Sequence, residues 1–560
     1  MRRRLGFVAA VGIVTAACSG APGDPVRLKP GTTDAPAVEK PGITDVPAGF
    51  GEHHHPIQTT SPEAQRLFDQ GMALAYGFNH EEAIRSFQGA AELDPNAAMP
   101  HWGRAWALGP NYNLDIDDPR AKQAFEAIDQ ARTLAERGPE HERAYVDALA
   151  VRYSADMKAN RAGLARAYST AMGELSRRYP DDLDAATLYA ESLMNLRPWK
   201  LWTLDGKPAA GTGRILSVLE SVLTRNPNHL GANHFYIHSV EASRTPGRAL
   251  PSAARLETLA PASGHLVHMP AHIHARTGDH GAAARANAAG AAADLKYLID
   301  APPDSLYGLM YYSHNLHFLG DSHMMQGRFG DAQQAAARVA QHLDRHASMM
   351  PMIESMIVMP VSVLLRFGRD ADVLALTAPP ADRPVQTAWH HFARGVALAR
   401  TGKPEEAVKE RATLAQAVAK VPESALFGGA GLESARTVLD LATMTLDARI
   451  AWARNDRDKA IQLWQRAVAA ADKLPYDEPP VWFYPIRESL GGALLLNGRV
   501  DEAERVFRED LERNPRNPRS LFGLQASLAK QGRNADAAWV QREFEEAWKN
   551  AETTLTIEGL

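Results

Sequence analysis

Histidine is concentrated in one short segment of the sequence. GHLVHMPAHIHARTGDH, residues 264–280, holds five of the 21 histidines in the chain. Histidines three or four residues apart lie on one face of a helix, where both imidazoles can reach the same metal ion. Pairs with this spacing also occur in two other segments, NHFYIHSVEAS (233–243) and YYSHNLHFL (311–319). We therefore expect several helices to present metal ligands.

The predicted ligand set consists of imidazoles with two nearby carboxylates. The single cysteine lies at position 18, far from these segments, and imidazole with carboxylate suits Zn, Cu or Fe. Nine groups exceed one coordination sphere, so we expect one or two transition-metal ions, with some groups orienting ligands or transferring protons. The expected metal ligands are His234, His238, His265, His268, His272, His314 and His317, with Glu241 and Asp321 as ligands or general bases.

Three residues beside these histidines are predicted to contact a substrate. Tyr236 and Tyr312 flank the histidine pairs, and Lys200 lies in the Pro/Gly-bounded segment LRPWKLWTLDGKP. A hydroxyl or an ammonium group can orient a bound molecule. A second interpretation stays open, in which the histidine-rich surface binds a peptide without metal.

The elements that must position these residues are helices. From Glu63 onward apolar residues recur at helical spacing, which predicts an all-α fold. A glycine is repeatedly followed by an alanine five residues later, as expected for a helical hairpin with a left-handed turn and a tightly packed second helix. These pairs are Gly278/Ala283, Gly327/Ala332, Gly402/Ala407, Gly498/Ala503 and Gly532/Ala537, with looser copies at Phe78/Ala83 and Asn455/Ala460.

The repeated unit resembles the tetratricopeptide repeat (TPR). AQRLFDQGMALAYGFNHEEAIRSFQGAAELDP matches its small, aromatic and terminal-proline positions with Gly71, Ala83, Phe87 and Pro95. The resemblance implies a TPR-type α-solenoid of stacked antiparallel helix pairs, in which the first helix of each unit lines a concave groove. In that register three successive units place the nine predicted groups in the groove. Pro270 allows another arrangement, in which a helix starts there and His265 and His268 belong to a loop.

The first 18 residues have the features of an export signal. A basic start is followed by an apolar run too short to span a bilayer. The ending TAAC resembles the bacterial lipobox, which implies lipidation of Cys18. Residues 19–50 contain six prolines and few large apolar residues, as in an extended tether. We expect a protein anchored by lipid to a bacterial cell envelope and facing the periplasm, with no other membrane contact.

The expected organisation after the tether has four parts: an N-terminal TPR pair (51–115), degenerate helical hairpins (116–230), central His-rich repeats (231–345) and C-terminal TPR repeats (346–551). The segments YGFNHEEAIRSF, GHLVHMPAHIHARTG and DEPPVWFYPIRESL together resemble a group of bacterial His-rich TPR lipoproteins. That resemblance implies this fold and location and implies no reaction.

The composition restricts the partners. The formal net charge is -5 and no long basic run occurs, so nucleic acid is not expected as a partner. The predicted ligand is a small molecule or a peptide in the groove, with an envelope protein as a further partner. The function that the sequence favours is that of a metal-dependent hydrolase or oxidase. The alternatives are a TPR scaffold that binds a protein or peptide without metal, and a metal store without chemistry.

Overall fold

The computed structural model describes residues 48–560 except 300, 302–304, 348–349, 351–352 and 429–432. Cys18 and the predicted signal peptide lie outside the described residues, as does the predicted tether up to residue 47. Within the described part of the chain, no helix combines the length and the apolar character needed to cross a bilayer.

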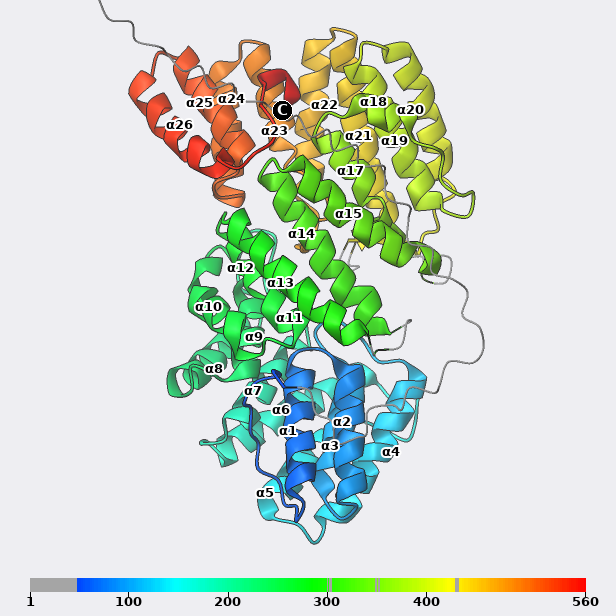
Figure 1. Cartoon of the computed structure of the whole chain (residues 1–560), viewed down its shortest axis with the longest axis vertical. Coiled ribbons are helices and arrows are strands. Elements are labelled where there is room, and N and C mark those ends of the chain that lie inside the picture. The colour runs from blue at the N-terminus through cyan, green and yellow to red at the C-terminus, as the bar shows by residue number, and fades with distance from the viewer. Residues whose placement is uncertain (1–47, 300, 302–304, 348–349, 351–352, 429–432) are drawn as a thin grey trace, which may run out of the picture. The chain divides into compact units, whose positions relative to one another are not determined.

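The first half of the described chain is a succession of helices (Figure 1). They are α1 (Pro62–Tyr76), α2 (His80–Leu93), α3 (Ala98–Leu108), α4 (Asp118–Ala135), α5 (Glu140–Ala150), α6 (Arg161–Arg178), α7 (Leu183–Met194), α8 (Thr212–Arg225), α9 (Leu230–Val240), α10 (Leu250–Leu259), α11 (Gly264–His268), α12 (Pro270–Arg276) and α13 (His280–Leu298). A 3₁₀ turn, η1 (Pro246–Ala249), precedes α10.

The second half of the described chain is also a succession of helices. Its helices are α14 (Ser313–Met325), α15 (Phe329–Leu343), α16 (Glu354–Ile357), α17 (Met359–Arg366), α18 (Asp370–Ala375), α19 (Pro384–Arg400), α20 (Pro404–Val418), α21 (Ala435–Ala453), α22 (Arg457–Ala471), α23 (Arg487–Leu496), α24 (Val500–Arg513), α25 (Pro518–Lys530) and α26 (Asn534–Trp548). The short elements are a π-helical turn, η2 (Gly308–Tyr312), two 3₁₀ turns, η3 (Asp344–His346) and η5 (Ile557–Gly559), and an antiparallel pair, β1 (Leu426–Phe427) and β2 (Glu433–Ser434).

The turns between paired helices have the backbone that the repeat pattern predicts. All seven predicted turn residues adopt positive φ: 83° at Gly278, and 74–77° at Gly327, Gly402, Gly498 and Gly532, with 63° at Asn455 and 59° at Phe78. The alanine five residues later is buried in every pair. The left-handed turn and the small packing residue therefore define each hairpin.

The aromatic residue of the repeat packs between glycines of two successive first helices. A Cβ built on Gly71 of α1 or on Gly103 of α3 would lie 2.5 Å from the Phe87 ring of α2. The same arrangement recurs with Gly491, Phe507 and Gly523 on α23, α24 and α25. Because the contact is repeated at both ends of the described chain, the prediction of an all-α, TPR-type α-solenoid is confirmed.

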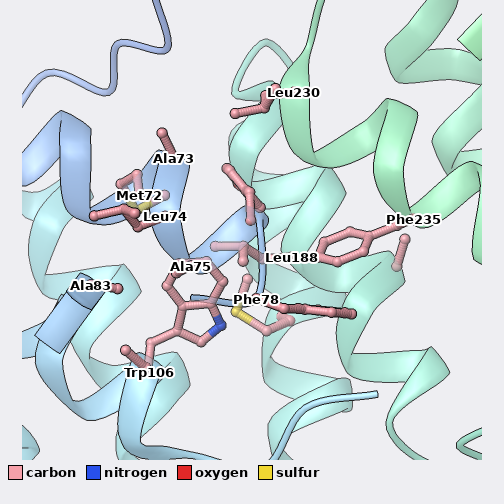
Figure 2. Packing of buried hydrophobic residues seen from close by; sticks show 14 of the residues in the cluster. Met72, Ala73, Leu74, Ala75, Phe78, Ala83, Trp106, Leu188, Leu230 and Phe235 are labelled. Atoms are coloured by element: carbon pink, nitrogen blue, oxygen red, sulfur yellow. The ribbon is translucent and has the colours of Figure 1, made fainter. Parts of the chain in front are cut away.

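The N-terminal helices enclose an apolar core that reaches the central histidine helices. Figure 2 shows Phe78, from the turn after α1, close to Phe235 of α9, and the two ring centroids are 6.1 Å apart. Leu188 of α7 and Leu230 of α9 belong to the same buried cluster. This packing fixes α9 against α1 and thereby positions one group of histidines.

Candidate metal centre

Six buried or nearly buried histidines from four helices form two adjoining triads. The first triad is His234 and His238 of α9 with His265 of α11. The second is His268 of α11, His272 of α12 and His314 of α14. Within each triad every residue offers a nitrogen less than 4.8 Å from those of the other two. The triads touch, because the ring centroids of His238 and His272 are 5.5 Å apart.

The Nε2 atoms of the histidines face one another. In the second triad, His268 Nε2 lies 2.8 Å from His272 Nε2 and 3.1 Å from His314 Nε2. In the first, His234 Nε2 lies 3.1 Å from His265 Nε2, and His238 Nε2 is buried with no hydrogen-bond partner. Three imidazoles around one metal ion place their nitrogens about 3.3 Å apart, given metal–nitrogen bonds of about 2.0–2.1 Å. The spacing therefore matches that of a metal site.

The opposite ring nitrogens fix the tautomers. His234 Nδ1 lies 2.5 Å from the Tyr76 carbonyl oxygen, and His268 Nδ1 lies 2.7 Å from Asn287 Oδ1. These oxygens only accept hydrogen bonds, so each Nδ1 carries the proton and each Nε2 presents a lone pair. Metal-binding histidines in proteins have the same arrangement, with the second nitrogen donating to an oxygen.

Glu241 connects the two triads. It directly follows α9, and its carboxylate accepts from His238 Nδ1 at 3.0 Å and from His272 Nδ1 at 2.7 Å. Glu478, in the segment between α22 and α23, also contacts His272 Nδ1. The structure thus brings Glu241 to the histidines, where its two oxygens orient one ligand of each triad.

Burial and charge set the protonation states. Burial lowers the pKa of His234, His265, His268 and His314, and the neighbouring imidazoles lower it further. These four are neutral at pH 7, the form that binds metals. Burial also disfavours a charged His272, but the Glu478 and Glu241 carboxylates outweigh it and raise its pKa. Without metal, His272 is therefore protonated on both ring nitrogens, and a metal ion bound at its Nε2 would displace the second proton.

Small residues let the helix backbones approach closely around the triads. A Cβ on Gly231 of α9 would lie 2.4 Å from the Tyr76 ring, and one on Gly290 of α13 would lie 2.7 Å from His268 Cβ. A Cβ on Gly264 would overlap the Asp294 carboxyl of α13. Tyr307 donates to that carboxyl at 2.8 Å. These contacts hold the start of α11 in place, with the backbone helical on both sides of Met269.

Aromatic side chains cover the first triad. The Phe78 ring lies 4.5 Å from the His234 ring and 5.3 Å from the His265 ring, centroid to centroid. A bulky residue in the left-handed conformation is rare and costs of order 1–3 kcal/mol. Tyr311 lies 4.8 Å from His265, and Tyr112 lies 5.3 Å from His238.

The other predicted site residues lie outside the triads. His317 and Asp321 of α14 line a neighbouring cavity. Tyr236 donates to Glu220 of α8 at 2.7 Å, and Tyr312 accepts from Arg338 at 3.1 Å. Lys200 is exposed. The two tyrosine hydroxyls therefore bond to residues outside the triads.

The central histidines are enclosed rather than displayed on an open groove. His234, His238, His265, His268 and His272 are at most 2% exposed. The repeat register predicts which helix face they share, and the segments that bury that face are the connections after α1, α3, α7 and α22. Phe78 and Glu478 could have been suspected from the sequence, since Phe78 stands where other units have glycine and Glu478 lies in a proline-rich turn.

A second histidine cluster surrounds Asp184 of α7. His55 Nδ1 lies 2.9 Å from Asp184 Oδ2, and His53 Nε2 and His229 Nε2 each lie 3.3 Å from Oδ1. Tyr76 donates to Oδ1 at 2.6 Å. His229 Nδ1 accepts from the Ala232 backbone N–H, so its Nε2 carries the proton. Here N–H and O–H donors converge on a carboxylate.

Comparison with known proteins identifies no family and no activity for this chain. No family model matches the chain, and no curated protein matches it. Similar solved structures include the human IFIT1 dimer with PPP-AAAA (13% identity, 85% of this chain and 89% of that chain, TM-score 0.32). They also include yeast Tom70 (14%, 88% and 92%, 0.28) and the APC/C hetero-tetramer Cut9-Hcn1 (14%, 83% and 76%, 0.29). At such low similarity, what those proteins bind implies nothing about this chain.

Proposed function

We propose that this protein is a copper-dependent oxidoreductase whose two ions are held by the two histidine triads, and that it oxidises a small organic molecule with dioxygen. The observation that carries the proposal is the convergence of imidazole Nε2 atoms, with the Nδ1 protons of His234, His268, His238 and His272 committed to oxygens. The Nδ1 contacts of His234 and His268 leave one buried Nε2 lone pair in each triad, and buried acceptors in native proteins normally have a partner.

The donor set favours copper. Each triad consists of three imidazoles, which bind Zn, Cu, Fe and Ni in their neutral form, and copper has the highest divalent affinity in that series. Two carboxylates, Glu241 and Glu478, lie next to His272 and balance the charge of two univalent ions. Copper supplies one-electron and dioxygen chemistry when bound.

Glu241 is not placed as the general base of a hydrolytic centre. A hydrolytic centre needs a general base that is free to take a proton from the attacking water. Both oxygens of Glu241 already accept hydrogen bonds from His238 and His272. Glu241 therefore orients ligands, and it is not placed as a free base.

Burial argues against the scaffold alternative. A groove that binds a peptide must present its side chains to that peptide, and five of the six histidines are at most 2% exposed. The lipid anchor at Cys18 and the periplasm-facing location remain part of the proposal and rest on the sequence alone.

The test is metal content together with oxygen consumption. The protein without residues 1–18, prepared without a histidine tag and loaded with copper, is expected to retain two copper ions per chain by elemental analysis. The double variant His238→Ala/His272→Ala, with one ligand removed from each triad, is expected to lose both. The matched control is His274→Ala, since His274 lies on α12 two residues from His272 and outside both triads.

Oxygen uptake with a panel of organic reductants then tests the reaction. Uptake that needs copper and disappears in the double variant supports the oxidoreductase. Stoichiometric zinc with hydrolytic activity would replace oxidation by hydrolysis. No retained metal after reconstitution would contradict the metal centre and return attention to a protein or peptide partner.

A further inference from the structure

A cavity adjoins the second triad. It is lined by residues of α14, α17 and α19, of β1, and of the segment between α22 and α23. Two independent elements lead from the triad to it. On α14, His317 lies one turn beyond the ligand His314, about 4.5 Å along the axis, and Asp321 lies one turn further. Glu478 contacts His272, and the next residue, Pro479, lines the cavity.

The cavity walls are apolar and aromatic. Trp389 of α19, Phe427 of β1 and Phe483 line it, and Met324, Val358 and Met359 add flexible or branched apolar surface. The Trp389 indole already donates to Ser362 at 3.1 Å, so the ring is held in place. Such walls favour a flat apolar body, because aromatic rings stack or meet edge to face.

Two polar side chains have unused hydrogen-bonding capacity in the cavity. His317 Nδ1 is buried without a hydrogen-bond partner. Asp321 is 9% exposed and lines the cavity. Its carboxyl forms no hydrogen bond or ion pair within the described residues. Buried polar groups in native proteins are normally satisfied, so these two groups call for a ligand that offers hydrogen bonds.

The surrounding charge selects a neutral ligand. A cationic ligand would be repelled by metal ions in the adjoining triad, and an anionic one by Asp321 and Glu478. Burial raises the pKa of Asp321 to about 7, although Arg366 lowers it, and burial lowers the pKa of His317 to about 4. At neutral pH both groups can therefore take part in hydrogen bonds with a hydroxyl.

We propose that this cavity is the substrate site and that its substrate is a small neutral aromatic alcohol, a phenol, whose hydroxyl is recognised by Asp321 and His317. The inference rests on the proposed function for calling the ligand a substrate. Binding itself depends only on the cavity, so it is tested separately from metal and turnover.

The experiment measures binding of 4-methylphenol by calorimetry to metal-free and to copper-loaded protein. Toluene, benzylamine and benzoate are the comparison ligands, because they lack the hydroxyl or carry a charge. We expect 4-methylphenol to bind both forms about tenfold more tightly than toluene, as one hydrogen bond to a buried group allows. Benzoate is expected to bind no better than toluene to either form, and benzylamine no better than toluene to the copper-loaded form.

Two variants locate the site. Asp321→Ala is expected to remove the advantage of 4-methylphenol over toluene, whereas Val358→Phe, which fills the cavity, is expected to block both ligands. Asp372→Ala on the exposed face of α18 is the control and should bind like the parent. Unchanged copper content and helical circular dichroism show that each variant is folded.

The outcomes separate the two proposals. Equal binding of 4-methylphenol and toluene, preference of the copper-loaded protein for benzylamine, or full binding by Asp321→Ala overturns the phenol site even if copper binds as proposed. If the protein binds phenol selectively but retains no copper after loading, the cavity is supported as a phenol site and the oxidoreductase is contradicted.

Discussion

The two histidine clusters use the same side chain in opposite ways. In the metal centre, Nδ1 protons point outward to oxygens such as the Tyr76 carbonyl, and Nε2 atoms converge. Around Asp184, the imidazole and phenol protons converge on a carboxylate. The converging nitrogens of the metal centre call for a cation between the rings. Around Asp184, the donors already balance the charge of the carboxylate. Tyr76 belongs to both, through its carbonyl and its hydroxyl, so the comparison can be tested one group at a time.

Removing Asp184 is expected to give the largest effect on stability and none on metal. Asp184→Ala leaves three imidazoles and the Tyr76 hydroxyl buried without their acceptor. Loss of one partner of a buried charged network costs about 3–5 kcal/mol. Chemical denaturation should show this loss, while copper stoichiometry stays at two. Loss of copper with an unchanged unfolding midpoint would mean that the roles of the clusters are reversed.

Changing Glu241 is expected to act on metal affinity. Glu241→Gln retains the shape but leaves one acceptor for two imidazole N–H groups, so either His238 or His272 loses its anchor. Removing such a partner typically weakens metal binding about 10–100-fold. Competition with a copper chelator measures it. Glu220→Gln, which alters the acceptor of Tyr236 on α8, is the control and should keep the parent affinity.

Much of this contrast could be predicted from the sequence, but only where the repeat determines position. The hairpin glycines predict the turns, and the helical register predicts that His234, His238 and His272 share a surface. The register does not describe connections between repeats. Glu478 comes from such a connection more than 200 residues from His272, and the Tyr76 carbonyl is a backbone group without a sequence signal.

Local backbone irregularity explains a further difference. A regular helix through YYSHNLHFL would place Tyr312 beside the histidines, and Tyr312 is predicted there as a substrate contact. The π-helical turn at Gly308–Tyr312 widens the backbone, and Tyr311 faces His265 while Tyr312 contacts Arg338 of α15. Such turns occur often at functional sites, and sequence periodicity does not reveal them.

Tyr76→Phe separates the two roles of Tyr76. The substitution removes the hydroxyl that donates to Asp184 and leaves the carbonyl that accepts from His234. Hydrogen bonds to charged groups contribute about 1.5–3 kcal/mol, so unfolding should require about 2 kcal/mol less. Denaturation and copper titration on one sample check this. A loss of copper affinity comparable to that in Glu241→Gln would show that the clusters are not independent.

The smallest expected effect is a pH dependence of the segment that carries His53 and His55. Burial lowers the pKa of both groups, but Asp184 outweighs it and raises their pKa above 6.5. Burial raises the pKa of Asp184, and the imidazoles outweigh that and lower it well below 3.8. Groups with a raised folded pKa stabilise fully below the unfolded value of 6.5 and lose that contribution as pH rises. Asp184, whose pKa is lowered in the folded protein, stabilises the folded state at pH values above 3.8 and loses that contribution as the pH falls.

The segment at residues 48–58 is therefore held most firmly between about pH 4 and 6.5, and loosens as the pH rises above that window. Limited proteolysis at matched protease activity should cut it faster at pH 8 than at pH 6. In His53→Gln/His55→Gln the rate should not change with pH. Faster cleavage at pH 6 than at pH 8 would contradict the assigned charges.

The most direct test of the central claim is anomalous diffraction at the copper edge from crystals of the copper-loaded protein. The account predicts two peaks, each about 2.0–2.1 Å from three imidazole nitrogens, one in each triad. A peak beside Asp184 with none among His234, His238, His265, His268, His272 and His314, or no ordered copper at all, would contradict it.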